Sequence, residues 1–216
     1  DYTGNGQYEE GQDTPLSNIN FKLYHLDDGW QYQTSQETDP DGCTTFSNLK
    51  SADHKYKIVE DYDDPDLDGY YPTNGITYYE NIQITPGSTE TRIFLNAQYR
   101  TIDGFKFNDL NGNATWDDGE PGLDNWTIFI DSNSNGLLDG GEISTTTDEN
   151  GFYEFTNLVA DSYRIAEKLE SNWTQTLPSL GYYDIDLHTE LSSSNNNFGN
   201  VQLSDIHGYK WHDFDN

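Results

Sequence analysis

The feature that most restricts the fold of this chain is an internal repeat about as long as a whole domain. Residues of a first loop recur 108 positions later, pairing Asp1 with Asp109, Gly4 with Gly112, Asn5 with Asn113 and Gly11 with Gly119. Further matches join Thr38–Gly42 to Thr147–Gly151, Tyr56–Glu60 to Tyr163–Glu167, and Ile206–Asp213 to Ile102–Asp109. Repeats of this length fold as separate globular domains in tandem, whereas solenoids repeat every 20–45 residues or so.

Apolar and polar residues alternate within each repeat at the period of a β-strand. Trp126, Ile128 and Ile130 fall on one predicted face, and Tyr163 and Ile165 on another. Gly, Asn, Asp and Pro interrupt these runs, and no stretch has a helical period. The sequence therefore predicts an all-β chain of tandem, immunoglobulin-like antiparallel β-sandwiches. The expected domains are residues 1–100, without a first strand of their own, residues 101–205, and a further first strand in residues 206–216.

Composition excludes several classes of function. The chain has 39 Asp and Glu against 10 Lys and Arg, a formal charge of −29, which repels nucleic-acid phosphates. Aromatic residues make up 14%, which argues against a disordered acidic tail. No apolar run is long enough for membrane insertion of this segment. A single cysteine, Cys43, rules out an internal disulfide, so an extracellular chain of this kind needs a core, a metal or another crosslink.

The strongest chemical signal is a twelve-residue loop that starts at Asp131. Oxygen-bearing residues stand at positions 1, 3, 5, 9 and 12, Gly136 stands at position 6, and position 7 offers its backbone carbonyl. This is the spacing of a calcium loop, in which alternating side chains turn towards one ion. The predicted ligands are Asp131, Asn133, Asn135, Leu137 through its carbonyl, Asp139 and Glu142.

A second loop repeats this spacing 22 positions earlier, with Ala114 where glycine is preferred. Its predicted ligands are Asp109, Asn111, Asn113, Thr115, Asp117 and Glu120. Two full matches in one repeat favour calcium as a bound ion, and the alternative is a pair of Asx-rich turns without metal.

Repeat one has weaker candidates. Asp1, Thr3 and Asn5 keep the early ligand positions, but position 12 is the neutral Gln12. The other loop is shortened to a hairpin turn at residues 27–29. A separate acidic cluster crowds carboxylates that repel one another unless a cation screens them. It is either a calcium site or a solvated acidic loop, and its members are Asp61, Asp63, Asp64, Asp66 and Asp68.

Three strings of repeat two, Gly104–Trp126, Thr147–Leu158 and Tyr163–Glu167, carry a resemblance to a known family. They read GFKFNDLNGN…DDGEPGLDNW, TDENGFYEFTNL and YRIAE, and they resemble the B-type repeats of serine–aspartate-repeat surface adhesins. Those repeats are similar to collagen-adhesin B-type, prealbumin-like domains. The resemblance implies a calcium-stabilised β-sandwich that serves as a stalk module of a secreted cell-surface protein. Repeat one departs from the pattern at Gln12 and lacks the second loop.

Some relatives in this superfamily carry a Lys–Asn isopeptide crosslink promoted by a buried acid. The resemblance names Lys106, Glu167 and Asn200 as candidates for such a crosslink. Lys106 lies between Phe105 and Phe107 in a predicted strand, so the alternation predicts a solvated lysine that points away from the core. We therefore expect no crosslink here, and an intact mass short of one ammonia would overturn that expectation.

The expected function is structural. Neighbouring repeats or subunits of the same protein are the expected partners, either along one polypeptide or by exchange of the strand 206–212 between chains. No nucleophile elbow, phosphate loop or metalloprotease helix appears, so an enzyme is not expected. The alternative is an adhesin module that recognises a glycan or a protein through exposed aromatic side chains, with Tyr70, Tyr71, Tyr78 and Tyr79 as candidates.

Overall fold

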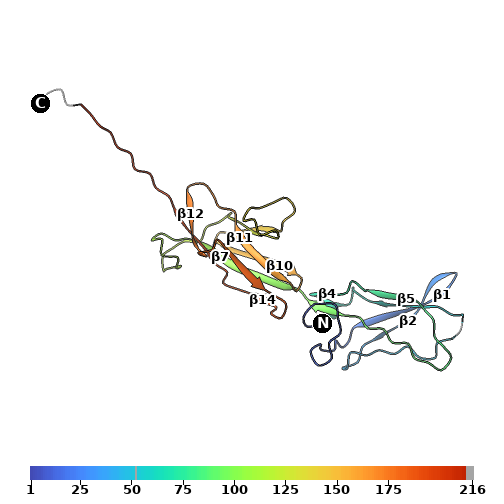
Figure 1. Ribbon diagram of the computed structural model, residues 1–216. Helices are drawn as coiled ribbons and strands as arrows, with labels where there is room; N and C mark the ends of the chain where they lie inside the picture. Colours follow the sequence, from blue (N-terminus) through green and yellow to red (C-terminus); the bar gives the residue numbers. More distant parts are fainter. Residues whose placement is uncertain (52, 213–216) are drawn as a thin grey trace. The chain divides into compact units, whose positions relative to one another are not determined.

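A computed structural model describes residues 1–51 and 53–212 of the chain (Figure 1). It separates into two compact units. Unit 1 comprises residues 1–100 with 157–161 and 188–191, and unit 2 comprises 101–156, 162–187 and the segment from 192 onward. The described residues contain fifteen β-strands and one short 3-10 turn, η1 (Pro65–Leu67). The predicted all-β class is therefore confirmed. None of the helical structure described is long and apolar enough to cross a membrane.

Unit 1 is built on a four-stranded antiparallel sheet in the order β2-β1-β3-β5. Its strands are β1 (Asn20–Asp27), β2 (Gly29–Glu37), β3 (Tyr56–Glu60) and β5 (Tyr78–Ile82). A two-stranded antiparallel sheet joins β4 (Tyr70–Pro72) to β6 (Asn96–Gln98). Phe21 and Leu23 alternate with half-buried residues along β1 and are buried in the core, as a one-sided strand requires.

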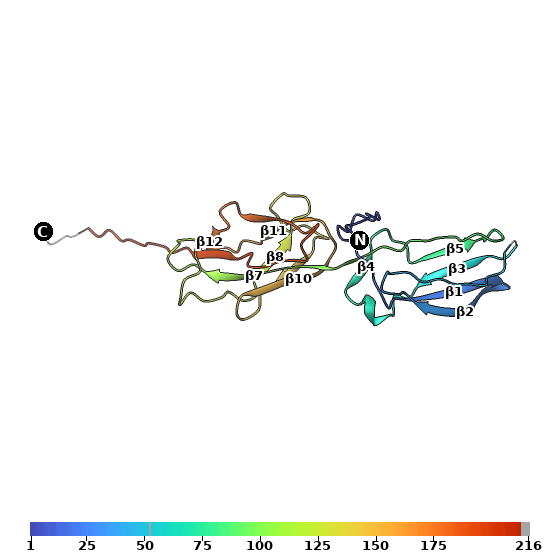
Figure 2. The same ribbon diagram turned by 90° about the horizontal axis from the view of Figure 1, so that it is seen from below.

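Unit 2 contains a five-stranded and a four-stranded sheet, and Figures 1 and 2 label several of their strands, among them β7, β10 and β11. The first has the order β10-β7-β15-β12, with β14 also paired to β7; its strands are β7 (Arg100–Asn108), β10 (Phe152–Leu158), β12 (Trp173–Leu177), β14 (Ser192–Ser193) and β15 (Phe198–Gln202). The second is antiparallel in the order β13-β11-β8-β9, from β8 (Thr127–Ile130), β9 (Ser144–Thr146), β11 (Ser162–Glu167) and β13 (Tyr182–Asp186). Strand β7 runs parallel to β15 and β14. The buried residues Ile102, Ile128, Tyr153, Ile165 and Phe198 bring side chains of both sheets into the core of unit 2.

In both units a buried threonine fixes the backbone just before a core strand, β1 in unit 1 and β8 in unit 2. The buried Thr38 hydroxyl accepts from the N–H of Ile19 at 3.0 Å and donates to the Leu16 carbonyl at 2.7 Å. In unit 2, Thr147 makes the equivalent bonds to Trp126 and Leu123, at 2.9 and 2.6 Å. The repeat seen in the sequence is thus also a repeat of specific buried hydrogen bonds.

At Gly122 the backbone passes so close to the backbone of Asn150 that there is no room for a side chain. A Cβ atom at Gly122 would lie 2.0 Å from the Asn150 carbonyl oxygen. Because that neighbour is backbone, Gly122→Ala is expected to destabilise unit 2 by about 1–3 kcal/mol, the usual cost of overpacking. Gly140→Ala is the control, since a Cβ there meets nothing within 4 Å. Equal denaturation midpoints for the two variants would show that this contact is not a constraint.

Candidate functional site

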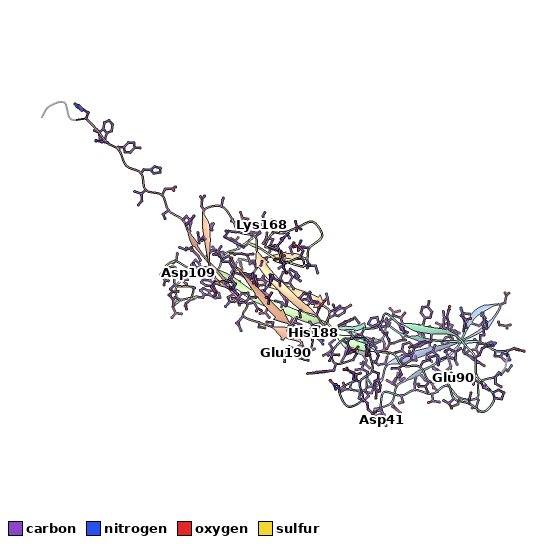
Figure 3. All side chains as sticks on the ribbon, in the orientation of Figure 1. Asp41, Glu90, Asp109, Lys168, His188 and Glu190 are labelled. Atoms are coloured by element: carbon purple, nitrogen blue, oxygen red, sulfur yellow. The ribbon has the colours of Figure 1, made fainter. Side chains whose placement is uncertain are left out.

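The two predicted calcium loops of unit 2 begin where buried strands end. Asp109 follows β7 and Asp131 follows β8, and the two residues are only 0% and 2% exposed. Figure 3 labels Asp109 at the start of its loop. Each loop therefore starts with a carboxylate fixed by a rigid strand, while most of the remaining loop residues are exposed.

In the first loop, hydrogen bonds hold the oxygen-bearing side chains around one region. Asp109 accepts from the backbone N–H groups of Asn113 at 3.1 Å and Ala114 at 2.8 Å. The side-chain amides of Asn111 and Asn113 both donate to Asp117 Oδ2, at 2.9 and 2.8 Å. Glu120 closes the loop, because its two oxygens accept from the N–H groups of Leu110 at 2.8 Å and Asp117 at 2.9 Å.

The second loop has the same bonds at equivalent positions. Asp131 accepts from Asn135 and Gly136 at 3.0 and 2.9 Å. The amides of Asn133 and Asn135 donate to Asp139 Oδ2 at 2.8 and 2.7 Å. Glu142 accepts from Ser132 and Asp139, each at 2.9 Å. At position 7, the N–H groups of Thr115 and Leu137 donate to the Asn two residues earlier, at 2.8 and 2.7 Å.

These bonds favour ionised acids. Burial pushes the pKa of Asp109 upward, but the Thr176 hydroxyl and the N–H groups of Ala114 and Asn113 outweigh it and hold that pKa below its ordinary value. The amides of Asn133 and Asn135 likewise lower the pKa of Asp139. A hard cation needs ionised, oxygen-only ligands, so the donor chemistry of both loops fits calcium.

The acids of the loops do not by themselves make a metal cluster. In the described parts of the chain, no group of three or more His, Cys, Asp or Glu side chains has an arrangement that could hold a metal ion. The predicted ligands also include asparagine oxygens and a backbone carbonyl. His, Cys, Asp and Glu side chains are therefore only some of the predicted ligands of each loop. Calcium in these loops stays a prediction.

Unit 1 begins with a loop of the same construction. The acid that closes this loop is one residue beyond position 12, where the sequence has Gln12. Asp1 accepts from Asn5 and Gly6 at 3.2 and 2.6 Å, as Asp109 accepts in unit 2. Asp13 accepts from the N–H groups of Tyr2 and Glu9 at 2.9 and 2.7 Å, which is the role of Glu120. Sequence reasoning missed Asp13 because it lies one residue beyond position 12.

Two oxygens of this first loop lack partners. Thr3 Oγ1 and Glu9 Oε2 are buried and make no hydrogen bond in the structure. Burying a polar group without a hydrogen-bond partner costs about 1–3 kcal/mol of folding free energy, and more for a charged carboxylate. An ion held by Asp1, Thr3 and Asn5 would supply the missing interaction, so the residues present fit a cation here as well.

The acidic cluster of residues 61–68 is held by other contacts. Asp61 forms an ion pair with Lys22 at 2.6 Å. Asp64 accepts from the Asn20 N–H at 2.7 Å and from the Asp66 N–H at 3.0 Å, which caps η1. The side chains of Asp63, Asp66 and Asp68 are exposed. Calcium binding by this cluster stays a prediction.

The prediction that Lys106 faces solvent is wrong. Lys106 is 0% exposed and shares the inward face of β7 with the buried Ile102. Phe107 occupies the opposite face, where Trp116 stacks on it with ring centroids 5.5 Å apart. Strand β7 is paired on both edges and covered on both faces, so its aromatic rings do not identify one core face.

Lys106 lies in a buried cluster with Glu167 and Asn200. Its Nζ is 3.2 Å from Glu167 Oε2, 3.3 Å from the Phe198 carbonyl oxygen and 4.5 Å from the centre of the Trp126 ring. Asn200 is 0% exposed, and neither amide atom has a hydrogen-bond partner. The Lys106–Glu167 contact has an ion-pair distance without hydrogen-bond geometry, and both Glu167 oxygens also lack a hydrogen bond.

The surroundings of this cluster favour neutral side chains. Burial lowers the pKa of Lys106 to about 8, against the opposing effect of the Glu167 charge. Burial also raises the pKa of Glu167, although the Lys106 charge partly offsets the shift. A neutral amine is a nucleophile and a neutral carboxyl is a proton donor, so the cluster holds an amine, a side-chain amide and an acid–base group together.

The four candidate tyrosines of unit 1 do not share one exposed surface. Tyr78 is 50% exposed, whereas Tyr70, Tyr71 and Tyr79 are half-buried. Tyr79 packs on core residues and donates to the Ile93 carbonyl at 2.8 Å, and the Tyr70 hydroxyl accepts from the Gln98 side chain at 3.1 Å. Three of these rings are thus parts of the packing of unit 1.

The segment that follows β15 leaves the sheet as an extended chain (Figures 1 and 2). No strand is formed by residues 203–212. Ile206, Tyr209 and Trp211 are 99%, 87% and 85% exposed. The predicted first strand of a following repeat also includes residues 213–216, which lie outside the described residues.

Comparisons with known proteins identify relatives of this chain. A model of the family described as "SdrD B-like domain" matches residues 100–210. Colossin-A of Dictyostelium discoideum is 28% identical over 203 residues, covering 82% of this chain and 2% of that protein. Serine-aspartate repeat-containing protein D of Staphylococcus aureus is 28% identical over 167 residues, covering 72% of this chain and 12% of that protein. The chain thus spans a small fraction of these relatives.

Among solved structures, the shaft pilin SpaA of Lactobacillus rhamnosus GG has a TM-score of 0.39 at 13% identity, covering 94% of each chain. The minor pilin GBS52 of Streptococcus agalactiae has a TM-score of 0.35 at 13% identity, covering 92% of this chain and 88% of the pilin. The family match spans more than half of the sequence and includes both loops, the buried lysine and Asn200. The chain belongs to the SdrD B-like domain family.

Proposed function

We propose that this chain is a calcium-stabilised structural repeat of an extracellular stalk, filament or surface-layer protein. The observation that carries the proposal is the identical set of hydrogen bonds in the two loops of unit 2, 109–120 and 131–142. Family membership supports a structural repeat, since related proteins include serine-aspartate repeat-containing protein D. A relative from Staphylococcus epidermidis is named fibrinogen-binding protein, and the chain spans 16% of it. The alternative, ligand recognition through Tyr70, Tyr71, Tyr78 and Tyr79, has less support, because only Tyr78 of these four is an exposed ring.

Calcium would supply positive charge between acids that otherwise repel one another. In unit 2 this charge would stabilise the loop that covers one face of β7. Loop 109–120 places Trp116 against Phe105 and Phe107 on the outer face of β7, at 5.3 and 5.5 Å between ring centroids. The Trp116 indole also donates to the Glu120 carbonyl at 2.9 Å. Fixing this loop therefore keeps β7 covered, and an acidic chain depends on a cation to fix it.

Removal of calcium is expected to loosen both loops. In excess chelator, unit 2 should melt at a lower temperature, and proteases should cut within 109–120 and 131–142 first, because fixed loops resist cleavage. The measurement is calorimetric melting, with limited proteolysis followed by mass spectrometry. Readdition of calcium is the control. If neither the melting curve nor the cleavage sites responded to chelator, calcium would have no structural role.

The buried cluster of unit 2 favours a second, covalent means of stabilisation. We propose that Lys106 and Asn200 form an amide crosslink between β7 and β15. The neutral Lys106 amine would attack Cγ of Asn200, forming the new C–N bond, while Glu167 moves the amine proton to Nδ2, which leaves as ammonia. The reaction removes the orphaned amide nitrogen and needs no oxidant. Its product ties together the two central strands of one sheet.

Assembly is the third part of the proposal. We propose that units join by strand addition, with residues 206–212 of one copy pairing with unit 1 of another. Support comes from the match of Ile206–His212 to the strand sequence Ile102–Asn108 and from the exposure of its apolar side chains. An extended segment with apolar side chains can add as a strand to the edge of a sheet.

A further inference from the structure

The solvent-facing side of the four-stranded sheet of unit 1 carries aromatic rings, where polar residues are usual. Strands β2, β1, β3 and β5 lie side by side in this sheet (Figure 2). Phe21 and Leu23 of β1 point into the core, so the alternation of the strand places Tyr24 on the opposite face. Tyr24 pairs with Tyr32 of β2 and with Lys57 of β3, which puts all three side chains on that outer face.

Two further rings complete a cluster around Lys57. The strand pairing places Trp30 of β2 and Tyr78 of β5 on the same face. Lys57 Nζ lies 5.2 Å from the ring centre of Tyr24 and 5.5 Å from each of the ring centres of Trp30 and Tyr78. Tyr32 meets Tyr24 edge-on, with ring centroids 5.8 Å apart. These five residues together form the outer aromatic face of unit 1.

Lys57 is a cation without an anion. The chain has 39 acids against 10 Lys and Arg, and Lys22, on the same face, pairs with Asp61 at 2.6 Å. Within the part of the chain that the structure describes, the Lys57 ammonium makes no ion pair and no hydrogen bond. Three ring faces stabilise its charge instead. A carboxylate from outside the chain would therefore meet a cation that no acid has neutralised.

The polar atoms of the rings are also available to a ligand. Within residues 1–51 and 53–212, the hydroxyls of Tyr24 and Tyr78 and the indole N–H of Trp30 have no hydrogen-bond partner, and none of these atoms is buried. Tyr32 and Tyr78 are 57% and 50% exposed, whereas Tyr24 and Trp30 are half-buried. Rings on a paired sheet lose little conformational entropy when a ligand packs on them. The face thus combines flat apolar surface with hydrogen-bond donors and one cation.

This combination fits a carboxylated sugar. A sugar ring presents C–H groups on its faces and hydroxyls at its edge, which match aromatic faces with polar tips, and a carboxylate on the sugar can pair with Lys57. A protein partner usually covers about 20–30 residues on each side of the interface, far more than these five. The chain's charge of −29 disfavours a densely charged polyanion, and physiological salt screens all but nearby charges, within about 8 Å. A glycan with few carboxylates suits both conditions.

We propose that the outer aromatic face of unit 1 binds a carboxylated sugar of a glycan chain. The sugar ring would pack on Trp30 and Tyr78, its carboxylate would accept from the Lys57 ammonium, and its hydroxyls would bond the Tyr24 hydroxyl. The site goes beyond the structural role proposed above. It uses no residue of the calcium loops, so its test is independent of calcium binding.

The test titrates the whole 216-residue chain with sialyllactose and with digalacturonate, by calorimetry and saturation-transfer NMR. At least one of these acidic sugars should bind, and the methyl ester of the same sugar should bind at least tenfold more weakly. Lys57→Met, which keeps the apolar stem, should reduce binding of the acid to that of the ester, and Lys57→Arg should retain it. Trp30→Ala should abolish binding. Lys50→Met, at an exposed lysine of the same unit, is the control and should bind as the wild type does.

Other results would overturn the proposal. Equal binding of acid and ester would remove the role of Lys57, and binding unchanged in both Lys57→Met and Trp30→Ala would place the sugar elsewhere. Absence of binding of both acidic sugars would eliminate the site. A triglutamate peptide that binds more tightly than the sugars, and is lost in Lys57→Met, would assign the face to an acidic peptide instead. Self-association in sedimentation that is lost in Trp30→Ala would assign it to a second copy of the chain.

Discussion

Lys106→Met is expected to restore the intact mass to the value of the unmodified sequence and to lower the melting temperature of unit 2 sharply. A crosslink between residues 106 and 200 closes a loop of nearly 100 residues, which in the chain-entropy model stabilises a fold by about 4.7 kcal/mol. For a domain of this size, that corresponds to a fall of about 20–35 °C. The wild-type chain should weigh one ammonia less than its sequence.

Two companion variants separate the crosslink from simple packing. Glu167→Gln keeps the amine and the amide but removes the acid–base group, so it should also weigh the full sequence mass. Lys168→Met changes an exposed neighbour and should keep both the mass deficit and the wild-type melting temperature. A wild-type chain at full mass, with Lys106 and Asn200 recovered in separate unmodified peptides, would eliminate the crosslink of unit 2.

The second large effect is expected from Glu120→Gln combined with Glu142→Gln. Each glutamate offers two oxygens at position 12, and glutamine offers only one, so calcium should bind both loops more weakly. A hundredfold loss of affinity at free calcium near 100 times the original Kd removes about 2.3 kcal/mol per site. In calcium the double variant should therefore melt at a clearly lower temperature than the wild type.

Chelator distinguishes this explanation from the loss of hydrogen bonds. Glu120 and Glu142 also accept backbone N–H groups, and glutamine can retain part of that role. The wild type and the double variant should melt close together in chelator and far apart in calcium. Glu149→Gln, at an exposed turn, is the matched control and should resemble the wild type in both conditions. A gap that is as large in chelator as in calcium would show that the glutamates act only through the backbone.

The two loops of unit 2 could be located from the sequence because their construction is local. Twelve consecutive residues contain the carboxylates, the amides and the backbone donors that they engage. Asp13 was missed for the same reason: a loop longer by one residue places its closing acid outside a fixed spacing, although the acid still reaches Tyr2 and Glu9.

The orientation of Lys106 could not be predicted from its neighbours in sequence. Alternation identifies two faces of a strand, but which face is the core depends on what covers each one. Trp116, from the loop that follows β7, covers Phe107 on the outer face, while Glu167 from β11 and Trp126, which directly precedes β8, lie against Lys106. Those contacts join residues that are far apart in the chain.

The buried pair of Glu60 and Asn96 in unit 1 shows the same limit. The two residues are 36 positions apart, and the motif that relates Asn96 to Asn200, FLNAQ against FGNVQ, is only a few residues long. Only the folded unit brings the two side chains together, through the hydrogen bond that joins β3 to β6.

Calorimetric titration of calcium into the calcium-free chain tests the central proposal most directly. We expect binding heat with at least two ions bound per chain, and loss of those two binding events in the Glu120→Gln, Glu142→Gln double variant. Absence of binding heat, or binding that is unchanged in the double variant, would contradict a structural repeat organised by calcium in the loops 109–120 and 131–142.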